Sequence, residues 1–240
     1  MKNNIFYTFL LLLIFLNLNL QAEELEINSS NVQYDDKNKI TIFEGGVIVV
    51  DERGNKLFSE YASYNKLDEV IETVGSTKII TSGGYEVLSK NIIFDNKKKI
   101  IQSNYKTQIT DNDGNKTLVD MFDYSILTNI FFSKGSIKVY DINNNNYNFS
   151  EIYIDEKNKK IIGSDVRAFL NQDNISINDK NEPRFFANTM SFMGSTNTFE
   201  KGIFTYCKNR KNDKCPPWTL QSKKIKHDLA KKTIYYDNVV

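Results

Sequence analysis

The sequence predicts an all-β protein built from stacked units of about 30 residues. Helix signals are nearly absent, and a polar, lysine-rich turn such as DDKNK, NKLDE or DNKKK recurs along the first two thirds of the chain. No unit of this length can bury a core alone, so the pattern favours a long stack of units over a compact enzyme. An aromatic or large apolar residue precedes each turn, at Tyr34, Tyr64, Phe94, Tyr124 and Ile154.

Within one unit, short strands alternate with turns. The segments 69–73, 76–82 and 85–94 are rich in Ile, Val, Tyr and Thr, which favour a pleated and half-buried surface. SGG at 82–84 and DGN at 113–115 are typical of hairpin turns, because Gly and Asn tolerate a positive φ. A glycine recurs eleven places after the aromatic position, and we interpret it as a bend between two sheets. These glycines are Gly45, Gly75 and Gly135.

Side-chain alternation predicts which residues face the interior. A branched apolar residue stands fifteen places after each aromatic position, beside a mostly polar neighbour, and further apolar residues align on the returning strand. Two interpretations of this interior stay open: a closed hydrophobic core, or an open apolar trough for lipid. The predicted lining residues are Val49, Ile79, Ile109, Val139, Phe58, Leu88, Leu118, Ile92 and Phe122.

The repeat loosens after Leu170. The polar segment 171–183 is typical of a loop, and two distorted units follow, separated by a polar insertion at 208–217. Phe192 and His227 stand in the position of Tyr64, and Asn238 stands in the position of Gly75. We therefore interpret His227, the only histidine of the sequence, as a register position and not as a catalytic base.

Composition and the N-terminus narrow the function classes. Lys2, an apolar run at 5–16 and Ala22 before two acidic residues predict a secretory signal cleaved after residue 22, with an uncleaved anchor as the alternative. The 31 basic and 30 acidic residues leave a net charge of +1. The chain lacks the basic excess of a general nucleic-acid binder, so we expect no nucleic-acid partner.

Motifs for chemistry are absent from the sequence. It has no G-x-S-x-G, P-loop or zinc-ligand spacing, so we expect no enzyme activity, catalytic residue, metal or cofactor. Cys207 and Cys215 are expected to be oxidised in a secreted chain, either with each other or with cysteines elsewhere. A catalytic thiol is disfavoured, because a cysteine nucleophile needs a base beside it.

The C-terminal part resembles a known family. CPPWTLQSKKIKHD at 215–228 and KKTIYYDNV at 231–239 resemble the segment before the barrel in the LptD family of lipopolysaccharide-assembly proteins. FFAN at 185–188 and KGIFTYC at 201–207 resemble the same family. Residues 31–170 resemble the OstA-like repeats that LptA, LptC and the periplasmic domain of LptD share.

The resemblance implies an open β-jellyroll with two bent antiparallel sheets. It divides the chain into a signal peptide (1–22), OstA-like repeats (23–170) and distorted repeats (171–240) that lead toward an outer-membrane barrel. No barrel strands follow in this sequence, so we expect either a fragment or a free periplasmic paralogue. In the family, cysteines near this point pair with cysteines at the far end of the barrel, which leaves the pairing of Cys207 and Cys215 open.

For function, the resemblance implies that an apolar groove holds acyl chains of lipopolysaccharide and passes them across the periplasm to the outer membrane. The implied partners are lipopolysaccharide, an LptA-like bridge protein at the N-terminal edge and, where a barrel is present, an LptE-like lipoprotein. The main alternative is a stand-alone bridge protein of the LptA or LptC kind, against which the CPPW segment argues. A β-solenoid adhesin and a polysaccharide-active protein are weaker alternatives.

Overall fold

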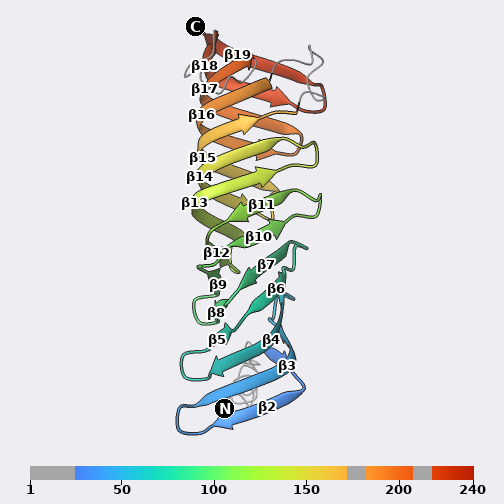
Figure 1. Ribbon diagram of the computed structural model, residues 1–240, viewed down its shortest axis with the longest axis vertical. Coiled ribbons are helices and arrows are strands. Elements are labelled where there is room, and N and C mark those ends of the chain that lie inside the picture. Colours follow the sequence, from blue (N-terminus) through green and yellow to red (C-terminus); the bar gives the residue numbers. More distant parts are fainter. Residues whose placement is uncertain (1–24, 172–181, 208–217) are drawn as a thin grey trace, which may run out of the picture.

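The structure is a computed structural model that describes residues 25–171, 182–207 and 218–240. Every regular element in these residues is a β-strand, and neighbouring strands run antiparallel, as β3 and β4 or β16 and β17 do. The strands stack into an elongated body, with the N-terminal strands at one end and β19 at the other (Figure 1). The all-β prediction is confirmed, whereas the predicted signal peptide lies outside the described residues.

The strands follow one another along the chain with short turns between them. They are β1 (Glu26–Asn28), β2 (Asn31–Asp35), β3 (Ile40–Val50), β4 (Lys56–Asn65), β5 (Val70–Thr73), β6 (Ser76–Ile80), β7 (Glu86–Lys90), β8 (Ile93–Asp95), β9 (Ile100–Ser103), β10 (Thr107–Thr110), β11 (Lys116–Val119), β12 (Phe122–Ser125), β13 (Ile130–Tyr140), β14 (Asn146–Asp155), β15 (Lys160–Phe169), β16 (Glu182–Met193), β17 (Thr196–Cys207), β18 (Leu220–Asp228) and β19 (Thr233–Val239).

The stack has two walls, which the short central strands make visible. In the first wall, β4 pairs with β5, β5 with β8, β8 with β9, β9 with β12, and β12 with β13. In the second wall, β4 pairs with β6, and the pairing continues through β7, β10 and β11 to β13. The long strands β3, β4 and β13 contribute one half to each wall. The two bent antiparallel sheets of an open jellyroll are therefore confirmed.

Each long strand bends where it passes from one wall to the other, and we call the line along which these bends lie the corner. Gly45 and Gly46, with φ of +76° and +73°, form a bulge in β3, and Gly135 forms one in β13. Gly75, with φ of +86°, separates β5 from β6. These are the recurring glycines of the sequence, and their left-handed backbone is the bend that we predicted. In later strands the same conformation is taken by Asp165, Lys201 and Asn238.

The turns of successive units share a recurring backbone conformation. In most first-wall turns a non-glycine residue takes a left-handed conformation at the end of the turn, at an energetic cost that the local hydrogen bonds offset. The residue that opens the turn accepts these bonds: Asp95 Oδ1 accepts from the Lys98 amide at 2.9 Å, and Asp155 Oδ1 from the Asn158 amide at 2.9 Å. The left-handed residues are Lys39, Glu69, Lys99, Asn129, Lys159 and Lys232.

The second-wall turns are joined by an asparagine ladder. Within a turn, the Asp141 carboxylate accepts a hydrogen bond from the side-chain amide of Asn145 at 2.7 Å. Asn145 Oδ1 in turn accepts the backbone N–H of Asn171 at 2.8 Å, which extends the contact beyond its own turn. Two other pairs repeat this arrangement, Asp51 with Asn55 and Asp111 with Asn115, and their asparagines accept from the amides of Ser82 and Ile142.

The core lies between the walls as two facing rows of cross-strand neighbours. The first-wall row runs Tyr34, Thr41, Tyr64, Ile71, Phe94, Ile101, Tyr124, Phe131, Ile154, Ile161, Phe192, Asn197, His227 and Ile234. The second-wall row runs Ile27, Val49, Leu57, Ile79, Val87, Ile109, Thr117, Val139, Tyr147, Ala168, Phe185, Phe204 and Leu220.

Close packing at the corner gives a stability prediction. A Cβ atom on Gly163 would overlap the ring of Phe149, so Gly163→Ala should lower the free energy of unfolding by about 1–3 kcal/mol through overpacking. Gly194→Asn is the control, because Gly194 has open space around it and a φ of +61° that asparagine tolerates. Urea unfolding measures both, and an equal loss in the two variants would contradict the packing argument.

Candidate functional site in the interior and its seam

Six of the predicted lining residues face the interior. Val49, Ile79, Ile109 and Val139 occupy the inner row of the second wall and are buried. Ile92 and Phe122, at the corner, are completely buried. The alternation in the sequence therefore placed these side chains between the walls, while their contact with a lipid stays a prediction.

Phe58, Leu88 and Leu118 lie on the outer face of the second wall, which corrects their predicted position. Leu88 pairs with Lys78 and Gln108, and its side chain is 41% exposed. The inner position on these strands belongs to the preceding residue, as Leu57, the partner of Val49, shows. Apolar residues stand both at Phe58 and Leu88 and directly before them, whereas Thr117 precedes Leu118. A shift of one residue moves a side chain to the opposite face.

The interior is filled by side chains in the described residues. Aromatic rings pack closely within it, with ring centroids 4.2 Å apart for Tyr124 and Phe131 and 4.5 Å apart for Phe185 and Phe199. The spaces recorded between the walls are small, about 20 Å³ and about 60 Å³. A lipid chain would therefore have to replace contacts between the walls, instead of entering an open trough.

Opposite the corner, the turns of the two walls meet along a line that we call the seam. Arg53, in a second-wall turn, donates from Nη1 to the carbonyl of Ile126 at 2.7 Å and to that of Leu127 at 3.3 Å. Lys99 of the first wall forms an ion pair with Glu52 at 3.4 Å. Side chains from the turns make these contacts across the seam, in contrast to the backbone ladders that run within each wall.

A buried carboxylate makes a further polar contact across the seam. Glu156 of a first-wall turn accepts hydrogen bonds from the Tyr124 hydroxyl at 2.7 Å and from Thr81 Oγ1 in a second-wall turn. Gly83 leaves room for it, because a Cβ there would overlap the Glu156 carboxylate. Burial, and then the Glu156 carboxylate, raise the pKa of Tyr124, so its hydroxyl keeps the proton that it donates.

Beyond Glu156 the seam is lined by apolar side chains. Ile161 and Phe192, which pair across β15 and β16, are only partly buried. Both line the space of about 60 Å³, which also touches Asp111 and Lys159, and both line the space of about 20 Å³ that lies deeper. This part of the seam therefore leads from charged turns into the apolar interior.

The first-wall row contains two neighbouring polar residues near the C-terminal end of the stack, just before Ile234. Asn197 and His227 are fully buried neighbours on β17 and β18. Asn197 Nδ2 donates to the Tyr147 hydroxyl at 3.1 Å, and this hydroxyl lies 3.1 Å from Asp141 Oδ2. The register places His227 in the row of Tyr64, as the sequence predicted, and its burial lowers its pKa.

Cys207 is the one predicted disulfide residue that the structure describes. It is buried at the end of β17, where Arg184 Nη2 donates to its Sγ at 3.2 Å and the Thr205 hydroxyl lies 3.4 Å away. Cys215 lies outside the described residues, so the pairing of the two cysteines stays a prediction.

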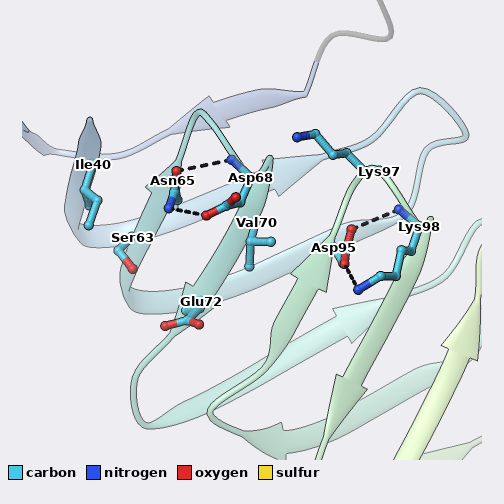
Figure 2. A pocket seen from close by; sticks show the side chains of 9 residues that line it. All are labelled: Ile40, Ser63, Asn65, Asp68, Val70, Glu72, Asp95, Lys97 and Lys98. Atoms are coloured by element: carbon cyan, nitrogen blue, oxygen red, sulfur yellow. Dashed lines mark hydrogen bonds and ion pairs between the residues drawn. The ribbon is translucent and has the colours of Figure 1, made fainter. Parts of the chain in front are cut away.

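A larger hollow, of about 500 Å³, lies on the first wall near its turns (Figure 2). Four of its five charged side chains have partners: Asp95 forms an ion pair with Lys98 at 2.9 Å, and Asp68 accepts from the Asn65 side chain at 2.7 Å. Lys97 donates to the Leu67 carbonyl at 2.6 Å. These contacts are those of a solvated surface with well-ordered turns, and the interior remains the stronger candidate.

Two further features are absent from residues 25–171, 182–207 and 218–240. No group of three or more His, Cys, Asp or Glu side chains in these ranges could hold a metal ion. Within the same ranges, no helix has the length and apolar character needed to span a membrane.

Comparison with known proteins gives a match among solved structures alone. No known protein family and no curated protein matches the sequence. Among solved structures, the chain is similar to LptH from Pseudomonas aeruginosa, described as the LptA homologous periplasmic component of the lipopolysaccharide transport device. The two chains are 16% identical, and the match covers 59% of this chain and 82% of LptH with a TM-score of 0.26. A likeness at this level carries no functional argument.

The seam contacts predict the effect of removing Arg53. Arg53→Ala should lower the free energy of unfolding by about 1 kcal/mol, because two carbonyls lose a charged donor, and should increase binding of an apolar fluorescent dye by loosening the seam. Arg167→Ala removes the same charge from an exposed outer position and is the matched control. Equal dye binding by both variants would show that Arg53 does not hold the seam.

Burial of His227 predicts a pH dependence of stability. Its folded pKa lies below 6.5, mainly because burial opposes the charge, although Asp141 and Asp228 favour it. The unfolded chain therefore binds more protons as pH falls below 6.5, and stability falls toward the folded pKa. His227→Phe should remove this slope below about pH 6.5, and unfolding by urea at a series of pH values measures it. An unchanged slope would assign it to other groups.

Proposed function

We propose that this chain holds acyl chains of lipopolysaccharide between its two walls, in the periplasm, as part of an LptD-like assembly protein. One observation carries the proposal: two mainly apolar rows face each other along the stack, and side-chain contacts close the interior along the seam. The resemblance to OstA-like repeats, given above on its residues, points to the same ligand.

The free energy needed to part the two walls at the seam supports this role. Parting the walls at the seam breaks contacts such as those of Arg53 and Glu156, and leaves the backbone ladders within each wall intact. Each methylene group removed from water contributes about 0.8 kcal/mol, so a chain of about ten would contribute roughly 8 kcal/mol. An acyl chain between the walls can therefore offset the lost contacts between inner side chains.

The ends of the stack suit a protein that passes its ligand onward. In the described residues, β19 pairs on one side with β18, and β2 pairs on one side with β3. Each therefore presents a free edge to which another strand can be added. Tyr34 and Val32 at the N-terminal edge are exposed, which supports an LptA-like partner there, with transfer toward the outer membrane at the other end.

A stand-alone bridge protein of the LptA or LptC kind is the second candidate function, because free edges at both ends suit it equally. Both candidates are non-catalytic. In support, the buried carboxylates Asp51, Glu156 and Asp228 all accept hydrogen bonds within turns or across the seam. An LptE-like partner belongs only to the LptD-like alternative, so recovery of such a lipoprotein with the chain from cells would favour that alternative.

Photo-crosslinking tests the proposed function. A photoreactive residue in place of Val49, Ile79, Ile109 or Val139 should capture lipopolysaccharide, because these side chains face the interior. The same residue in place of Lys138, directly beside Val139 on the outer face, is the matched control, as is Leu88. Failure of all four inner positions to capture lipid, or equal capture by Val139 and Lys138 variants, would contradict the proposal.

A further inference from the structure

The polar residues near the C-terminal end of the first-wall row connect the two walls through the interior. Asn197 belongs to the first wall and Tyr147 to the second, and the Asn197 side chain donates to the Tyr147 hydroxyl at 3.1 Å. His227 lies beside Asn197 on the neighbouring strand. The preceding members of the row are the apolar residues Ile154, Ile161 and Phe192. In this part of the row, the change from apolar to polar side chains is therefore confined to Asn197 and His227.

Several polar atoms at this place have no partner within the described residues. They are Asn197 Oδ1 and both ring nitrogens of His227, and both residues are fully buried. A buried polar atom without a hydrogen bond costs about 1–3 kcal/mol. Apolar side chains would avoid this cost, as Ile161 and Phe192 do next to them. The cost is therefore best explained by a ligand that supplies the missing hydrogen bonds.

The side chains determine which ligand chemistry fits. Asn197 Oδ1 accepts hydrogen bonds, and a neutral imidazole offers one donor and one acceptor. Asp141, whose Oδ2 lies 3.1 Å from the Tyr147 hydroxyl, places a carboxylate next to the group. This carboxylate disfavours phosphate and other anions. A neutral group that both donates and accepts, such as a hydroxyl or a secondary amide, matches the site.

The space at this place has the size and the lining for such a group. About 20 Å³ is bordered by Asn197, Tyr147 and Asp141 and, on its apolar side, by residues such as Phe149 and Met190. This is room for one water-sized group. The space reaches Ile161 and Phe192, which also line the outer space at the seam, so a hydrocarbon chain entering there would follow an apolar path to the polar atoms.

We propose that Asn197, His227 and Tyr147 form a recognition site for a hydroxyl or amide group carried on an acyl chain. The proposal rests on the proposed function, because the chain must lie between the walls for its polar group to reach these side chains. It adds a selection among lipids: chains with a hydrogen-bonding substituent are held in place at this point of the stack, and plain chains are not.

Calorimetric binding of two uncharged probes to the full chain tests the proposal. Methyl 3-hydroxydodecanoate should bind about tenfold more tightly than methyl dodecanoate, the gain expected from a buried hydrogen bond. The double variant Asn197→Leu, His227→Phe should bind both probes equally. His227→Gln keeps a donor and an acceptor and should retain the preference. Asn148→Leu, on the outer face of β14, should leave it unchanged.

The outcomes separate this proposal from the proposed function. If the wild-type chain binds neither probe, the proposed function itself is contradicted. If it binds both equally, lipid binding stands and the recognition site is wrong, with buried water satisfying the polar atoms. A preference that persists in the folded double variant would also overturn the site. Thermal unfolding of each variant confirms that it is folded, and Asn197→Leu alone provides a second, milder test.

Discussion

The corner is the constraint on which the rest of the structure depends. Each long strand belongs to both walls, so its backbone must turn between two sheets without losing its ladder partners. Gly45, Gly75 and Gly135 meet this demand with a positive φ, and Asp165 and Lys201 do so without glycine. Because the bend falls at nearly the same place in every strand, the walls stay in register along the stack. The inner rows, the seam and the polar end of the interior all follow from this repeated bend.

The two sides of the interior differ in what joins the walls. At the corner the walls share the same strands, so separation there would require breaking the chain or its ladders. At the seam they share hydrogen bonds and an ion pair from turn side chains. The interior is apolar and cannot remain empty in water, so it is filled by its own residues, such as Phe131 and Tyr124. The two walls are therefore joined by continuous strands at the corner, whereas side-chain contacts alone keep them closed at the seam.

Much of this architecture could be predicted from the sequence, because it follows from local patterns. The repeat of aromatic residues, the glycine bend and the register position of His227 needed only spacing. The outer position of Leu88 was missed because two apolar residues stand side by side on that strand, and local alternation cannot choose between them. The seam could not be predicted either: Arg53 and Ile126 are 73 residues apart, and their contact depends on how the walls meet. Asn197 is polar in an apolar row, which was a signal that could have found it.

The asparagine ladder has a mechanical consequence. Side-chain amides tie the rim of the second wall from turn to turn, so this rim resists stretching along the axis of the stack. At 81–85, Thr81 and Tyr85 replace the aspartate and asparagine, yet the turn stays tied to both neighbours, because Asn55 accepts from the Ser82 amide and the Asn112 side chain donates to the Gly83 carbonyl at 2.7 Å. Thr81 also contacts Glu156 of the opposite wall. Bending or twisting of the stack should therefore move both walls together at this turn.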